Sequence, residues 1–210
     1  MAQAPSPIVE KSVPPLETGD MLTREEFERR WDLHPEIKKA ELINGMVFLE
    51  VSVSPRHGRS HGHISGWLAT YSANHPEAEF HADTTVRLGD NDVQPDALLR
   101  FVIGGRSRWA DDAIEGPPEL AVEVAVSSVA KDMHIKKDAY RRAGVLEYLV
   151  WQVWDRRVDW WELRDGQYVS IEPDADGVIE SLVFPGLRLH VPKLLEGDLA
   201  GVLAELQPRA

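Results

Sequence analysis

Apolar and polar positions alternate at two different spacings along the chain. Helical spacing predicts helices over roughly residues 23–31, 57–74, 129–143 and 194–206. Short apolar runs between them predict strands at 41–52 (two strands about Asn44-Gly45), 79–88, 93–102, 120–126, 147–154, 157–163, 167–173 and 182–189. Residues 1–19 are proline-rich and lack an apolar period, which predicts a flexible arm. Residues 20–210 are then expected to form one α/β domain around a single mixed sheet.

Two acidic residues interrupt strands that are otherwise apolar. Glu123 lies in ELAVEVAV, and Asp96 follows Pro95 in QPDALL. An unpaired carboxylate inside such a run costs several kcal/mol, so each acid requires a partner. The residues alone leave two kinds of partner open, namely a basic side chain (or backbone amides) and a shared metal ion.

The basic helix that follows Glu123 offers one candidate partner. Asp132, Lys136 and Tyr140 are spaced four residues apart and share one helical face. That face can return over the sheet and point Lys136 at the two carboxylates. A solvent-exposed stripe of salt bridges explains the same spacing.

Composition limits the possible functions. A net charge of −12 argues against blanket binding of DNA phosphates. The absence of cysteine excludes disulfides and thiolate metal sites, so oxygen ligands would favour Mg²⁺ or Mn²⁺ over Zn²⁺. No apolar run reaches the roughly 18 residues of a membrane span, and the first residues do not resemble a signal peptide. We therefore expect a cytoplasmic protein with no membrane partner.

Histidines and tryptophans form two further clusters. His57, His61 and His63 lie near the start of a predicted helix, where they could bind zinc or pack, with His57 or His61 facing the carboxylates. The predicted hairpin carries four tryptophans, namely Trp151, Trp154, Trp160 and Trp161. Such rings can stack on unpaired bases, although filling a core or a subunit interface is the more common role.

Four segments together resemble a known family. ELINGMV, QPDALL, PPELAVEV and DMHIKKDAYRRAGVLEYLV are similar, in this order, to the Uma2 family of restriction-endonuclease-like proteins, a branch of the PD-(D/E)XK superfamily. The resemblance covers roughly residues 20–195. It implies a restriction-endonuclease-like mixed sheet flanked by helices. Departures from the family pattern flank the acids, and the chain has Val126-Ser127, Leu149 and Gln152 at these positions.

The resemblance also implies a set of site residues. Glu41, Asp96 and Glu123 match the family's acids, and Lys136 matches a lysine moved to the helix from the strand position now held by Ala125. Tyr140 belongs to the same helix pattern.

The implied activity is Mg²⁺- or Mn²⁺-dependent hydrolysis of DNA by an endonuclease. Asp96, Glu123 and the backbone carbonyl of Val124 would hold the metal ion, and Lys136 would orient the nucleophile. Glu41 would bind a second metal ion or position water. Alternatives are a phosphodiesterase acting on RNA or a small nucleotide, and an inactive nuclease fold that serves as a binding or regulatory module. A homodimer is compatible with each of them.

Overall fold

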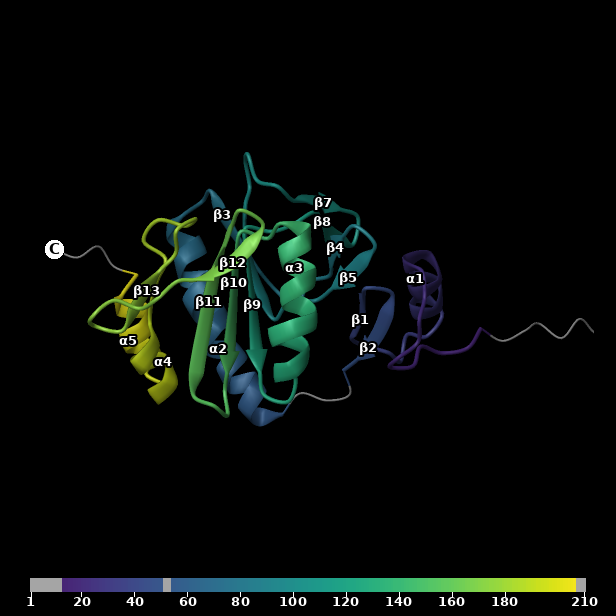
Figure 1. Ribbon diagram of the computed structural model, residues 1–210, viewed down its shortest axis with the longest axis horizontal. Helices are drawn as coiled ribbons and strands as arrows, with labels where there is room; N and C mark the ends of the chain where they lie inside the picture. The colour runs from purple at the N-terminus through teal and green to yellow at the C-terminus, as the bar shows by residue number, and fades with distance from the viewer. Residues whose placement is uncertain (1–12, 51–53, 207–210) are drawn as a thin grey trace, which may run out of the picture.

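The computed structural model describes residues 13–50 and 54–206, and two six-stranded sheets form its centre (Figure 1). Sheet A has the spatial order β2 (Met46–Leu49), β1 (Ala40–Ile43), β5 (Asn91–Val93), β4 (Val86–Leu88), β8 (Ala113–Glu115) and β7 (Arg108–Ala110). Sheet B has the order β12 (Gln167–Ser170), β11 (Arg157–Arg164), β10 (Glu147–Gln152), β9 (Leu120–Ala125), β6 (Ala97–Phe101) and β3 (Ala78–Ala82). A separate pair joins β13 (Val178–Glu180) to β14 (Arg188–His190). The expected mixed α/β architecture is confirmed, but its strands form two large sheets where a single sheet was expected.

Two of the predicted strands are each divided between the sheets. The run 79–88 breaks after β3, where Asp83 adopts a left-handed φ of 49°. The run 93–102 breaks at Gln94-Pro95-Asp96, because proline has no N–H to donate to a ladder. Asp96 therefore lies where the chain passes from sheet A to sheet B.

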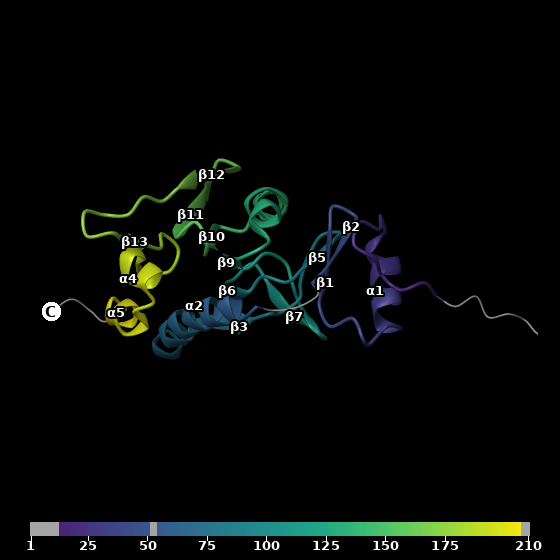
Figure 2. The same ribbon diagram turned by 90° about the horizontal axis from the view of Figure 1, so that it is seen from below.

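Sheet B is centred on β9, whose six residues are all buried. β9 runs parallel to β10 and antiparallel to β6. Helix α2 (Pro55–Asn74) lies on one side of the sheet, and η1 (Lys131–Lys136) with α3 (Lys137–Ala143) lies on the other (Figures 1 and 2). Ala121 and Ala125 pack in one cluster with Tyr140 of α3. Because side chains alternate along a strand, Glu123 projects toward η1 and α3 as well.

The predicted helices form with two corrections. α1 (Arg24–Asp32) is capped by Thr23, and α2 covers its predicted residues. The predicted helix over 129–143 begins as the π-helix η1 before α3. The predicted helix over 194–206 is two helices, α4 (Val191–Glu196) and α5 (Leu199–Ala204), because Gly197 adopts a φ of 81° between them. None of the helices in the described part of the chain is both long enough and apolar enough to cross a bilayer.

Part of the predicted arm of residues 1–19 is packed on the domain. Residues 1–12 lie outside the described residues. Leu16 is buried in a cluster with Phe27 and Val47, and the hydroxyl of Thr18 accepts a hydrogen bond from the Leu49 N–H. These contacts show that residues 13–19 pack on the domain, contrary to the prediction of a flexible arm. The sequence signal for this packing is weak, because it depends on a single leucine among prolines and polar residues.

The carboxyl group of Asp92 in β5 makes stability depend on pH. It is 2% exposed, and burial together with the nearby charge of Glu28 raises its pKa from 3.8 to about 6. The folded state binds this proton more tightly than the unfolded chain, so its stability falls as pH rises through this interval. We expect Asp92→Asn to raise stability at pH 8 by about 1–2 kcal/mol, or roughly 2–8 °C in Tm.

Thermal unfolding between pH 4 and pH 8 measures this effect. The gain of Asp92→Asn over the wild-type chain should shrink toward pH 4, where the carboxyl is protonated in the folded state. Asp90→Asn, at an exposed position of the adjoining turn, serves as the control and should leave the pH profile unchanged. A constant difference between Asp92→Asn and the wild-type chain at every pH would contradict this account.

Candidate active site

A cavity of about 550 Å³ opens between the two sheets, at the amino-terminal end of α2. Its acidic lining residues come from four parts of the chain and are Glu50, Asp96, Glu123 and Asp132. Ser54, His57 and Lys131 also line it. The structure thus places the two acids that interrupt apolar runs at one cavity.

Asp96 is held by three contacts from three segments. Its Oδ2 accepts a hydrogen bond from the Val124 N–H at 2.7 Å and lies 3.3 Å from His57 Nε2. Its Oδ1 lies 3.5 Å from Lys39 Nζ. Burial would raise the pKa of Asp96, but the His57 contact and the charge of Lys39 outweigh it and hold the pKa below its usual range. Asp96 is therefore an ionised carboxylate beside the cavity.

Glu123 is paired with the helix that follows its strand. Its Oε1 lies 2.6 Å from Lys136 Nζ and accepts a hydrogen bond from the Tyr140 hydroxyl at 2.9 Å. Burial raises the pKa of Glu123 well above its usual range, against the charge of Lys136. Burial disfavours the charge on Lys136, but Glu123 and Glu41 outweigh it and raise the pKa of the lysine. The expectation that the helix points Lys136 at a carboxylate is met for Glu123.

Glu41 is fully buried, and both its oxygens contact lysines. Oε1 accepts from the Gln94 N–H at 2.8 Å and lies 2.8 Å from Lys136 Nζ, and Oε2 lies 2.7 Å from Lys131 Nζ. Burial would raise the pKa of Glu41, but the two lysines lower it to about 2. Glu41 does not line the cavity. This geometry suits Glu41 to hold the two lysines in position, and it does not favour the predicted second metal site.

The π-helix explains why two lysines reach one carboxylate. Lys131 and Lys136 are five residues apart, which is the hydrogen-bonding interval of a π-helix. In an α-helix, residues five apart would diverge by roughly 140° around the axis. Sequence reasoning at α-helical spacing therefore found Lys136 and missed Lys131. Of the two, Lys131 lines the cavity, whereas Lys136 is 1% exposed behind Glu123.

The histidines divide between separate roles. His57 lines the cavity and touches the Asp96 carboxylate, and this contact raises the pKa of His57. His61 Nε2 lies 2.7 Å from the backbone oxygen of Asp96. His57 is thus the histidine that faces the carboxylates. The described residues contain no group of three His, Asp or Glu side chains placed to hold a metal ion, so the histidine zinc site has no support there.

Carboxyl groups outnumber lysine ammonium groups around the cavity. The carboxylates are those of Glu41, Glu50, Asp96, Glu123 and Asp132, and the ammonium groups are those of Lys39, Lys131 and Lys136. The sequence analysis singled out none of Lys39, Lys131 and Glu50, although Glu50 lies in the apolar run 46–52. Asp132 Oδ1 is buried and finds no hydrogen-bond partner among the described residues. Carboxylate oxygens are the ligand type that a hard divalent cation prefers. Because no three acidic or histidine side chains of the described residues are placed to hold a metal ion, backbone oxygen and water would have to complete such a site.

Comparisons with known proteins agree with this architecture. A crystal structure described as "a putative nuclease belonging to DUF820", from Anabaena variabilis ATCC 29413, matches with a TM-score of 0.66 at 14% sequence identity. The match covers 84% of this chain and 98% of that chain and shows a shared fold. No curated protein matches the sequence. The family model Uma2, described as "Putative restriction endonuclease", matches residues 24–192, and the chain therefore belongs to the Uma2 family.

Proposed function

We propose that this chain is a metal-dependent nuclease that hydrolyses phosphodiester bonds of DNA in the cavity between its sheets. The supporting observation is the surplus of carboxylates there, with Asp96 and Glu123 on its wall. A bound Mg²⁺ or Mn²⁺ would polarise the phosphate and lower the pKa of a coordinated water. Hydrolysis would add the oxygen of water to phosphorus and break one P–O bond, and the leaving oxygen would take up a proton, which leaves a phosphate end and a hydroxyl end.

Asp96, Glu123 and the backbone carbonyl of Val124 are the proposed ligands. Val124 donates its N–H to Asp96, whereas the carbonyl of the next residue, Ala125, accepts from Val153 on the β10 side. The N–H and C=O of one strand residue point to the same edge, so the Val124 carbonyl is directed to the side of Asp96. These oxygens fit a hard cation, with water completing its coordination.

The lysines have separate proposed roles. Lys136 joins Glu41 to Glu123 and is a positioning residue, because it lies behind the cavity wall. Lys131 faces the cavity, where its ammonium group can neutralise charge that develops on the phosphate. Tyr140 fixes the Oε1 atom of Glu123 through its hydroxyl. The proposed role of His57, whose Nε2 lies 3.3 Å from Asp96 Oδ2, is to exchange a proton with water or with the leaving oxygen.

One observation favours a second candidate function. The Lys136 ammonium group already neutralises part of the charge of Glu123, at 2.6 Å. A lysine that permanently replaces the cation would leave a nuclease fold without metal-dependent activity, which acts as a binding or regulatory module. Metal binding separates the two functions, because only the nuclease requires it.

Incubation of the purified chain with labelled oligonucleotides tests the proposal. The substrates are duplex, single-stranded and branched DNA, with RNA of the same sequences as a parallel set. We expect cleavage of DNA with Mg²⁺ or Mn²⁺ and none with EDTA. The proposal would be refuted by cleavage that persists in EDTA, or by DNA that stays uncut with both Mg²⁺ and Mn²⁺. Cleavage of RNA without cleavage of DNA would change the substrate class.

A further inference from the structure

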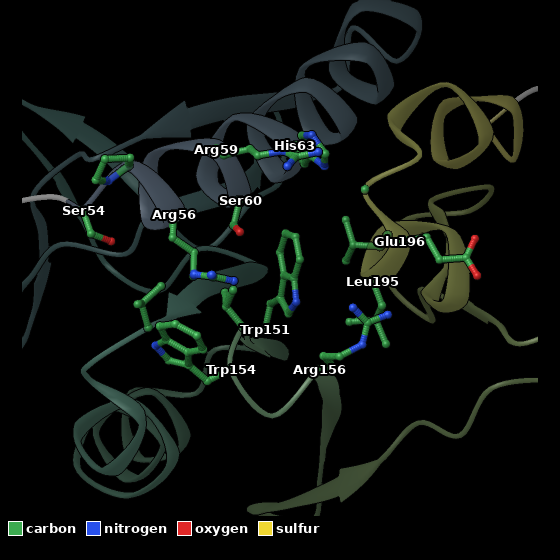
Figure 3. Close-up of a pocket in the computed structure, with 15 residues that line it drawn as sticks. Ser54, Arg56, Arg59, Ser60, His63, Trp151, Trp154, Arg156, Leu195 and Glu196 are labelled. Atoms are coloured by element: carbon green, nitrogen blue, oxygen red, sulfur yellow. The ribbon is translucent and has the colours of Figure 1, made fainter.

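A second and larger cavity, of about 920 Å³, adjoins the candidate active site. Its walls come from the start of α2, the loop between β10 and β11, and α4 (Figure 3). Ser54 and Val126 line both cavities, so the two are neighbours along the surface. Its volume lies within the range of ligand sites, about 300–1,000 Å³. The sequence predictions assigned no function to it.

This cavity concentrates positive charge on an acidic protein. Arg56, Arg59 and Arg156 line it, although the net charge of the chain is −12. Within the described residues, none of the three forms an ion pair. The carboxylate of Glu196, the acidic residue of the lining, points away from the tryptophans (Figure 3). Unpaired arginines beside an aromatic surface are typical of sites that bind phosphate groups.

Two tryptophans supply that aromatic surface. Trp151 lies at the centre of the cavity, and Trp154 lies at its edge with Arg56 stacked over its ring at 4.0 Å (Figure 3). Trp154 is 63% exposed, whereas Trp151, Trp160 and Trp161 are buried. The sequence left base stacking and core packing open for these tryptophans. Burial assigns three of them to packing and leaves Trp154 available for stacking.

Two buried ring nitrogens in this cavity have no partner. Trp151 is 6% exposed, and its Nε1 finds no hydrogen-bond acceptor among the described residues. His63 Nδ1 is likewise without a partner in the described part of the chain. The two rings stack at a centroid distance of 6.5 Å. Both nitrogens are shielded from solvent, so they lie inside the cavity wall and out of reach of a ligand in the cavity.

We propose that this cavity binds an unpaired nucleotide of the strand that enters the active site. This inference rests on the proposed nuclease function and narrows its substrate to nucleic acid with a single-stranded segment beside the cut. The base would stack on the exposed ring of Trp154. The adjoining phosphates would lie on Arg56 and Arg59, near the amino-terminal end of α2. A base inside a duplex cannot stack in this way, because both its faces are covered by the neighbouring base pairs.

Binding measured without metal tests this proposal independently of cleavage. Fluorescence anisotropy in EDTA compares a labelled 12-nucleotide oligo-dT with a duplex of equal length. We expect the wild-type chain to prefer the single strand. Trp154→Ala should weaken single-strand binding by roughly 5- to 150-fold, because stacking contributes about 1–3 kcal/mol per base. Arg56→Ala and Arg59→Ala should each lower the salt dependence of log K by about 0.7.

Trp109→Ala is the matched control. Trp109 is 59% exposed, on β7 of the other sheet, so its loss should not change affinity. Equal affinity for single strand and duplex, or no effect of Trp154→Ala and Arg59→Ala, would overturn the inference even if the chain cleaves DNA. If Trp154→Ala and Arg59→Ala weaken single-strand binding but the chain shows no metal-dependent cleavage, the inference is supported and the nuclease proposal is refuted.

Discussion

Asp96→Asn is expected to lower the proposed metal-dependent DNA cleavage by about 10²–10³-fold or more. It should also lower the free energy of unfolding, because the ionised carboxylate compensates the charges of Lys39 and His57. The amide oxygen of asparagine can still accept the hydrogen bond from the Val124 N–H, so the link between β9 and the segment before β6 remains. What disappears is the negative charge that faces Lys39 and the proposed cation. Single-turnover cleavage with excess enzyme measures the loss, and thermal unfolding shows whether the fold is intact.

Asp83→Asn provides the control for this substitution. Asp83 also contacts Lys39, at 3.2 Å, but its side chain is half exposed and does not line the cavity. Its left-handed backbone conformation suits asparagine. We expect cleavage within about twofold of the wild-type rate, as for other surface substitutions away from a site. Wild-type cleavage by Asp96→Asn would show that Asp96 is not part of the reaction centre.

Lys136→Met is expected to lower the free energy of unfolding by about 3–5 kcal/mol, which corresponds to a decrease in Tm of roughly 6–20 °C. Lys136 is 1% exposed and contacts Glu41 and Glu123 at 2.8 and 2.6 Å. Methionine preserves much of the volume but leaves both carboxylates without this ammonium group. Removal of one partner from a buried ion pair is costly, because the remaining charge has lost its compensation.

Chemical denaturation of this variant tests the positioning role of Lys136. Lys38→Met is the control, because Lys38 is exposed and bonds only the backbone oxygen of Pro35 among the described residues. It should change stability by less than about 0.5 kcal/mol. If Lys136→Met is as stable as Lys38→Met, the buried carboxylates are neutralised by another group, and the proposed role of the lysine is wrong.

The sequence was most informative about the acids because burial of charge is costly wherever it occurs. Glu123 stood out from its apolar neighbours on that ground, and Asp96 stood out after a proline. The helix spacing that led to Lys136 and Tyr140 depends on local geometry alone. Each of these residues lies at the site, where Glu123 contacts Lys136 and Tyr140.

Other features of the site depend on long-range structure that no local pattern records. Lys39 meets Asp96 through the packing of one sheet beside the other, across 57 positions of sequence. Lys131 reaches Glu41 because the helix begins with a π turn, and its sequence reads equally well as an α-helix. The breaks at Asp83 and Pro95 likewise decide which sheet each strand joins. A run of β-forming residues does not indicate its partner strand.

Titration calorimetry with Mn²⁺ tests the central claim most directly, namely that the carboxylates of Asp96 and Glu123 are placed to share a hard cation. The wild-type chain should bind Mn²⁺ at about one site, and Asp96→Asn should lose that heat while remaining folded. Wild-type protein that shows no binding, or an Asp96→Asn variant that binds Mn²⁺ as the wild type does, would contradict the account.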